Sequence, residues 1–207
     1  MDIQRIFSIS NPTEFEDVAL EVFQFQYKNN PVYKTYCDYL GKSPVNVAHS
    51  TEIPFLPIEF FKTQKITESS GTTQASVSKH FVPDLKIYEQ SFLNGFTSFY
   101  GPVDEYCILA LLPSYLEREG SSLVYMVNEL VSRSKHPDSG FYLYNLEELH
   151  QKLTILEKNQ IKTMLIGVSF ALLDLAEQAP IPLKNTIIME TGGMKGRRKE
   201  LIREELH

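Results

Sequence analysis

Four short apolar runs alternate with helical patterns in the second half of the chain, at residues 107–112, 141–144, 162–168 and 186–190. A strand buried on both faces is an almost continuous apolar run, and parallel strands are joined through helices. Right-handed crossovers would then place those helices on the faces of one sheet. We therefore predict an α/β fold, a three-layer sandwich with a mainly parallel sheet flanked by helices.

The segments between the runs carry helix signals. An apolar stripe at helical spacing follows the possible caps Ser121 and Ser122, and another follows Asn145. Residues 170–177 and 197–207 continue the third and fourth runs with helical patterns of their own. These segments complete the alternation of strand and helix over residues 105–207.

The first part of the chain is predicted to be helical. Thr13 and Glu16 have the spacing of a capping box, so a helix should start there with a buried stripe that begins at Phe15. A second helical pattern ends at Gly41. Residues 1–42 are therefore an expected N-terminal helical hairpin, and residues 43–104 an expected connector, loop and further helix.

Composition excludes several classes of protein. With 43% hydrophobic and 22% charged residues the chain is an ordinary globular one, and its net charge of −6 argues against a nucleic-acid partner. No apolar stretch is long enough to span a bilayer, and no basic leader precedes one. Cys37 and Cys107 are expected to be buried thiols of a cytoplasmic protein, and no residue spacing indicates a metal site.

A hydroxyl-rich loop is the strongest local signal for chemistry. Its centre combines serine, glycine and threonine, which offer amide and hydroxyl donors to a polyphosphate: Ser69, Ser70, Gly71, Thr72 and Thr73. The spacing is not that of a Walker A loop. The simpler interpretation is a solvated linker rich in serine and threonine.

A glycine-rich turn follows the last apolar run. Thr191, Gly192, Gly193 and Lys195 lie where open α/β sheets bind ligands, at the carboxyl end of a parallel strand. Basic residues in the first turn of a helix oppose its dipole, and a bound anion or an acidic neighbour would relieve that cost. The simpler interpretation is a glycine turn with solvated basic residues.

Gly167 and Ser169 lie at the end of the third run. Their spacing resembles the nucleophile elbow of an α/β-hydrolase, although Ala171 stands where the second glycine belongs. Only His207 follows the serine as a possible base, so a hydrolase is a distant alternative.

Four motifs in order carry a family resemblance: residues 56–63, residues 69–74 with His80, residues 112–123, and residues 190–197. Together they resemble the acyl-protein synthetases of the LuxE type, the long-chain-fatty-acid luciferin-component ligases. That family belongs to the adenylate-forming superfamily and is related to phenylacetate-CoA ligases. The motifs cover nearly the whole chain.

The resemblance implies ATP-dependent activation of a fatty acid or another carboxylic acid to an acyl-adenylate. The acyl group then passes to a thiol, either of an acceptor protein or of CoA, and Mg²⁺ accompanies ATP. The residues of the hydroxyl-rich loop would hold the β- and γ-phosphates. The cleft for adenine and the acyl group would be lined by Gly167, Ser169, Thr191, Gly192, Gly193 and Lys195.

The family's later motifs do not occur in this sequence, and its end falls inside an amphipathic pattern. We therefore expect residues 1–207 to be the N-terminal part of such an enzyme, without its C-terminal catalytic parts, and we assign no catalytic residue. Apolar surface left open at that end would favour a homo-oligomer. The alternative function is a non-catalytic module that binds a nucleotide, an acyl group or a partner protein.

Overall fold

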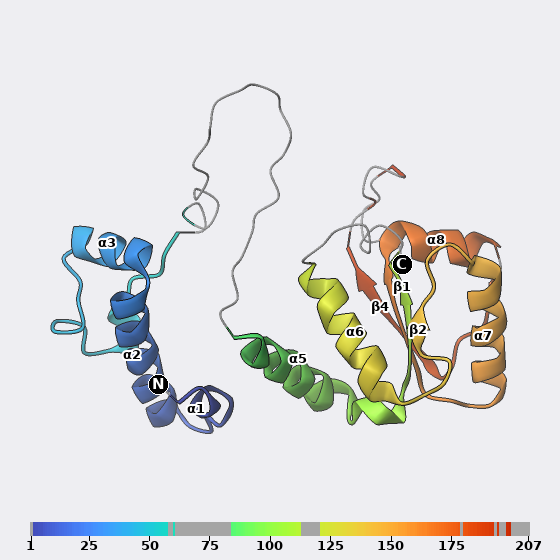
Figure 1. The fold of residues 1–207 in the computed structure, drawn as a ribbon, viewed down its shortest axis with the longest axis horizontal. Coiled ribbons are helices and arrows are strands. Elements are labelled where there is room, and N and C mark those ends of the chain that lie inside the picture. The colour runs from blue at the N-terminus through green and yellow to red at the C-terminus, as the bar shows by residue number, and fades with distance from the viewer. Residues whose placement is uncertain are drawn as a thin grey trace. The chain divides into compact units, whose positions relative to one another are not determined.

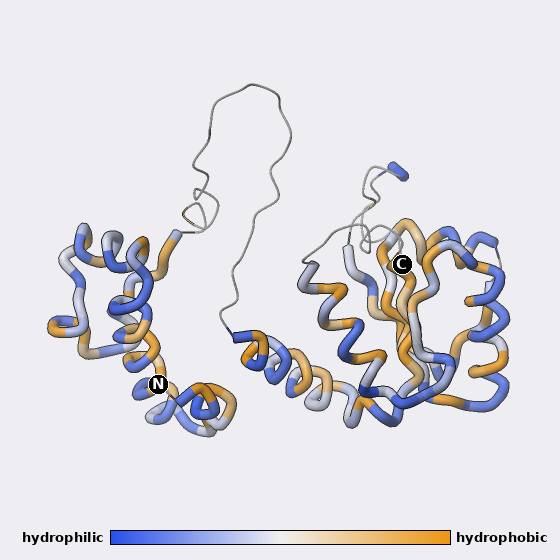
Figure 2. Tube along the Cα trace, in the orientation of Figure 1, coloured by the Kyte–Doolittle hydropathy of each residue, from blue (hydrophilic) through white to orange (hydrophobic). Residues whose placement is uncertain are grey.

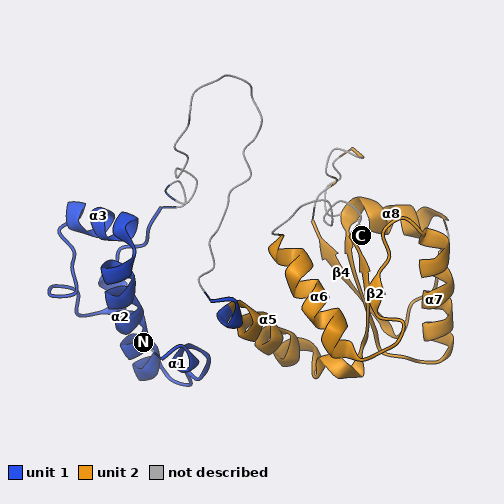
Figure 3. Ribbon diagram, in the orientation of Figure 1, with its two compact units in different colours: residues 1–87 blue, residues 88–207 orange. Residues whose placement is uncertain are grey.

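The computed structural model describes residues 2–57, 60, 84–112, 121–178, 180–192, 194, 198 and 199. The chain divides into two compact units, Met1–Ile87 and Tyr88–His207 (Figure 3). Each unit has a hydrophobic core of its own. In the described residues no helix is both long and apolar enough to cross a membrane.

Unit 1 is helical in its described part, with α1 (Gln4–Phe7), α2 (Pro12–Asn29), α3 (Pro31–Tyr39) and the short 3₁₀ turn η1 (Ser50–Glu52) (Figure 1). Asn30 alone joins α2 to α3, and its side chain accepts a hydrogen bond from the amide of Tyr33, which caps α3. The rings of Phe23 and Tyr33 meet edge to face beside the buried Cys37. These contacts hold the two helices together.

The start of α2 differs from the predicted one. Asn11 is the N-cap, because its side chain accepts from the amide of Glu14 at 3.0 Å, and Pro12 follows as the first helical residue. Glu14 in turn accepts from the amide of Ser10 at 2.8 Å. Asparagine before proline is a strong start signal, so it overrides the capping-box spacing at Thr13.

Unit 2 begins within α5 and alternates strands with helices: α5 (Leu85–Tyr100), η2 (Val103–Glu105), β1 (Cys107–Leu111), α6 (Ser122–Ser134), β2 (Gly140–Phe141), α7 (Leu146–Lys158), β3 (Thr163–Val168), α8 (Ser169–Gln178) and β4 (Thr186–Thr191). The strands pair in parallel in the order β2-β1-β3-β4. The predicted parallel sheet flanked by helices is therefore confirmed.

The helices of unit 2 cover both faces of the sheet. Figure 1 shows α6 on one face and α7 and α8 on the other. The chain moves outward from β1 to β2 and then returns past β1 to β3 and β4. Because the direction of travel reverses at β2, right-handed crossovers require the helices to change face at that point. The result is a three-layer arrangement.

The core of unit 2 lies around the two central strands. All residues of β1 and β3 are buried, and Figure 2 shows them as a hydrophobic centre between more polar helices. β4 is more open, since Ile187 and Ile188 are 38% and 52% exposed. These exposed isoleucines are compatible with the expected homo-oligomer, which stays a prediction.

β2 is shorter than the predicted run at 141–144. It ends at Phe141, although the amide of Tyr142 still donates to the carbonyl of Ala110 at 2.8 Å. The chain then turns away because Asn145 caps α7 by accepting from the amide of Glu148. Several expectations lie outside the described residues: the hydroxyl-rich loop, most of the helix at 197–207 and most of the motif at 112–123.

Candidate functional site

The topology of the sheet locates a candidate site. From β1 the chain runs to α6 on one face, whereas from β3 it passes directly into α8 on the other face. Connections that diverge in this way leave a crevice outside the carboxyl ends of the two adjacent strands, and open α/β sheets bind ligands there. This switch point lies beyond Leu111 of β1 and Val168 of β3, which brings the predicted residues Gly167 and Ser169 to it.

Ser169 is the first residue of α8 and is only 2% exposed. Its hydroxyl donates a hydrogen bond to the Glu190 carboxylate at the end of β4. Glu190 lies opposite Gly167 in the register of β3 and β4. The fold therefore brings Ser169 into contact with a carboxylate of the neighbouring strand, at the edge where the sequence predicts a cleft.

Gly167 is needed for space. A Cβ atom at this position would lie 2.7 Å from Cγ and Cδ2 of Leu172, closer than real Cβ atoms come to other heavy atoms. The missing side chain lets α8 turn back directly over the end of β3. Gly167 thus shapes the edge of the sheet through packing.

Thr191 pairs with Val168 at the last position of the register. Its hydroxyl oxygen is buried, and it is the one side-chain polar atom in the described part of the chain with neither solvent contact nor a hydrogen-bond partner. Leaving a buried hydroxyl unpaired costs about 1–3 kcal/mol. The exposed Gly192 follows directly, whereas Gly193 and Lys195 lie outside the described residues.

Arg198 belongs to the basic segment after β4. Its guanidinium forms ion pairs with Asp174 and Glu177 of α8, the second at 2.7 Å. These two carboxylates raise the pKa of Arg198, and Arg198 lowers the pKa of Glu177. The sequence leaves open whether an anion or an acidic neighbour neutralises this basic segment. For Arg198 the structure shows acidic neighbours, Asp174 and Glu177.

A second hollow lies at the carboxyl end of β2. It has a volume of about 460 Å³ and is lined by residues 140–145 with Glu148. Tyr142 and Tyr144 give it aromatic walls at the same edge of the sheet as Thr191, because all strands are parallel. No role was predicted from the sequence for these tyrosines, and Glu190 was named only within the motif at 190–197, although Tyr144 and Glu190 each end a predicted parallel strand.

The remaining sequence hypotheses concern other chemistry. A nucleophile elbow presents an exposed hydroxyl, whereas Ser169 is buried against a carboxylate, which weakens the hydrolase alternative. No group of three or more metal-binding side chains occurs among the described residues. Cys37 and Cys107 are buried free thiols, and burial raises the pKa of Cys107 to about 11.

Comparisons of the chain with protein-family models, with curated proteins and with solved structures found no match. The motifs of the sequence and the geometry of this edge of the sheet are therefore the features that bear on a function.

Proposed function

We propose that this chain supplies the nucleotide-binding part of a carboxylate-activating ligase of the acyl-protein synthetase type. In the proposed reaction a carboxylate oxygen attacks the α-phosphorus of ATP. The bond from this phosphorus to the β-phosphate oxygen breaks, which gives an acyl-adenylate and pyrophosphate. A thiol of an acceptor protein or of CoA then takes the acyl group and releases AMP.

The observation that carries the proposal is the unpaired Thr191 hydroxyl at the carboxyl end of β4. It lies one residue from the Ser169–Glu190 hydrogen bond and one residue before the exposed Gly192. A hydroxyl donor beside an open glycine backbone suits an oxygen-rich ligand such as a nucleotide. A ligand that bonds to this hydroxyl would also remove the cost of burying it alone.

The β- and γ-phosphates of ATP would bind to a different segment of the chain. By the family resemblance, Ser69, Ser70, Gly71, Thr72 and Thr73 would hold the β- and γ-phosphates, and these residues lie outside the described ones. Mg²⁺ usually binds to phosphate oxygens with only one or two carboxylates of the protein. Since the described residues contain no ready-made cluster for a metal ion, we propose that Mg²⁺ enters together with ATP.

Calorimetric titration of ATP with Mg²⁺ into the full chain tests the site. Thr191→Val keeps the shape of the side chain and removes the hydroxyl, so binding should weaken about tenfold, equivalent to the roughly 1.4 kcal/mol of one hydrogen bond. Thr154→Val is the matched control, because Thr154 is exposed on α7. Absence of ATP binding by the parent chain, or equal losses in both variants, would contradict the proposal.

Pyrophosphate exchange distinguishes the proposed ligase from the alternative, a non-catalytic module that binds a nucleotide. Because residues 1–207 are expected to lack the C-terminal catalytic parts, a longer form of the protein is incubated with ATP, Mg²⁺, radiolabelled pyrophosphate and fatty acids of several lengths, and label is followed into ATP. Exchange that requires the acid supports activation of a carboxylate. ATP binding without exchange supports a nucleotide-binding module instead.

A further inference from the structure

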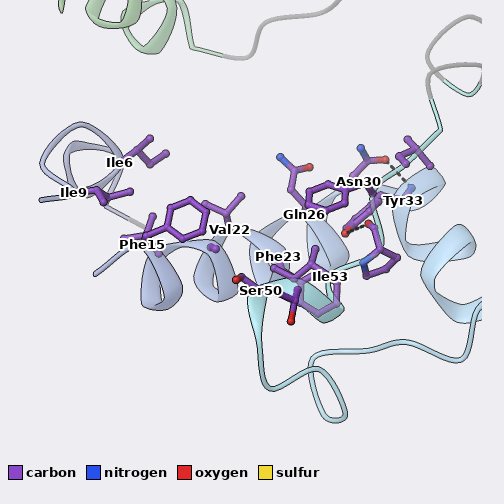
Figure 4. A pocket seen from close by; sticks show the side chains of 16 residues that line it. Ile6, Ile9, Phe15, Val22, Phe23, Gln26, Asn30, Tyr33, Ser50 and Ile53 are labelled. Carbon is purple, nitrogen blue, oxygen red and sulfur yellow. Dashed lines mark hydrogen bonds between the residues drawn. The ribbon is translucent and has the colours of Figure 1, made fainter. Parts of the chain in front are cut away.

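Unit 1 contains an apolar groove of its own (Figure 4). Its volume is about 700 Å³, within the roughly 300–1,000 Å³ that small-molecule sites have. Ile6 and Ile9 from the α1 region, one face of α2, and the segment from Ser50 to Leu56 line it. The sequence predicts a buried stripe from Phe15, but Phe15 is 54% exposed and forms part of this open groove.

The groove extends along most of α2. Its lining residues on α2 run from Phe15 to Asn30, at the end of the helix. Fifteen residues of helix rise by about 22 Å. One leaflet of a bilayer, and therefore one extended lipid chain, is about 15 Å thick in its hydrocarbon part. A single extended chain would fit along α2, whereas a compact ring system would leave much of the length empty.

The lining carries no charged side chain. Tyr33 and Ser50 are already engaged, since Tyr33 donates to the carbonyl of Pro54 at 2.7 Å and Ser50 donates to Glu16. Gln26 brings its amide group to one end of the groove, near Tyr33, and Asn30 brings its side-chain NH₂ there, because its Oδ1 already accepts from the amide of Tyr33 (Figure 4). The groove thus offers apolar walls along its length and neutral hydrogen-bonding groups at one end.

We propose that this groove binds one unbranched hydrocarbon chain, with the polar end of the ligand beside Gln26 and Asn30. Burial of methylene groups supplies the affinity, and the two amides orient the head group. Because no cation lines the groove, a long-chain alcohol binds at least as tightly as the acid of equal length. The inference uses residues of unit 1 alone and does not depend on ATP binding.

The absence of tryptophan from the sequence allows a clean reporter. Phe15→Trp places the single indole in the groove, and Phe99→Trp places it on an exposed site of unit 2 that lines neither hollow, as a control. Monomeric 1-alkanols of eight to fourteen carbons are titrated into each full-length variant. The emission of Phe15→Trp should shift to shorter wavelength and saturate, and affinity should rise about tenfold for every two methylenes.

Filling the groove tests the assignment of the site. Ala19 lines it on α2, so Ala19→Phe in the Phe15→Trp background should weaken alkanol binding at least tenfold. Ala176→Phe in the same background is the matched control on an exposed position of α8. Circular dichroism checks the folding of both. If Ala19→Phe does not fold, the chain-length series and the Phe99→Trp control still decide the question.

Several results would overturn the proposal. One is no shift for Phe15→Trp, and another is an affinity that does not depend on chain length. A shift of Phe15→Trp with protein concentration alone would show that a second copy occupies the groove. A shift with phosphatidylcholine vesicles but not with monomeric alkanol would assign the groove to membrane surfaces. None of these outcomes bears on ATP binding.

Discussion

Glu157, near the end of α7, fixes the start of β4. Its carboxylate accepts hydrogen bonds from the amides of Lys184 and Asn185 at 3.0 Å, from the Asn185 side chain at 3.1 Å and from the Thr186 hydroxyl at 2.7 Å. Four donors from three successive residues thus converge on one carboxylate. We predict that Glu157→Gln loosens β4 and lowers the stability of unit 2.

The size of the effect follows from these bonds. A hydrogen bond to a charged acceptor contributes about 1.5–3 kcal/mol, and the lower value suits a partly exposed group such as Glu157. Glutamine keeps one acceptor oxygen, so we expect about two bonds to be lost, roughly 3 kcal/mol. For a unit of the size of Tyr88–His207 each kcal/mol lowers Tm by about 4 °C, which gives about 12 °C.

The effect should depend on pH. Burial raises the pKa of Glu157. The hydrogen bonds from Thr186, Lys184 and Asn185 together lower the pKa by more than burial raises it, so the pKa lies below the ordinary value of 4.5. A lowered pKa stabilises the fold above the unfolded-state pKa, and this stabilisation is lost as the pH falls through the folded-state pKa. The difference in Tm between the parent and Glu157→Gln should therefore be largest at pH 7 and should become smaller near pH 3.

Thermal unfolding followed by circular dichroism measures the change, and Glu147→Gln is the control, because Glu147 is exposed on the same helix. The control should cost about 0.5 kcal/mol or less. A Glu157→Gln variant that melts within 2 °C of the parent at pH 7, or one whose deficit is the same at pH 3, would refute this account of β4.

Three further predictions concern single positions. Gly167→Ala should destabilise unit 2 by about 1–3 kcal/mol in urea unfolding, and Leu172→Ala in the same chain should recover part of the loss, since the new methyl group would meet Leu172. Cys37 and Cys107 should not react with a thiol reagent at pH 8 until the chain is denatured, because both are buried and burial raises the pKa of each. Arg198→Met should change ATP affinity less than twofold by calorimetry and lower the stability of unit 2 only slightly, because Arg198 is paired with α8.

Local signals predicted the elements of unit 2 well. Ser121 and Asn145 cap α6 and α7 as expected, because each side chain accepts from an amide only three residues ahead. The runs that became β1, β3 and β4 are within a residue of their predicted limits. These strands and caps depend on patterns within short segments of the chain, so they can be predicted from the sequence.

Features that depend on contacts distant in sequence were not predictable in the same way. The Ser169–Glu190 hydrogen bond requires the register of β3 and β4, and the pairs formed by Arg198 require the position of α8. The length of β2 was overestimated because the cap at Asn145 competes with the sheet for the chain. The groove in unit 1 was missed because a stripe that lines an open groove has the same spacing as one that is buried.

Hydrogen–deuterium exchange of the full chain with and without ATP and Mg²⁺ tests the central claim, that the carboxyl edge of the sheet holds the nucleotide. We expect protection at residues 167–169 and 190–192, where the Ser169 hydrogen bond and the unpaired Thr191 hydroxyl lie. Peptides at the opposite edge, around 162–163 and 185–186, should be unchanged. Protection confined to that opposite edge or to unit 1, or no protection at saturating ATP, would contradict it.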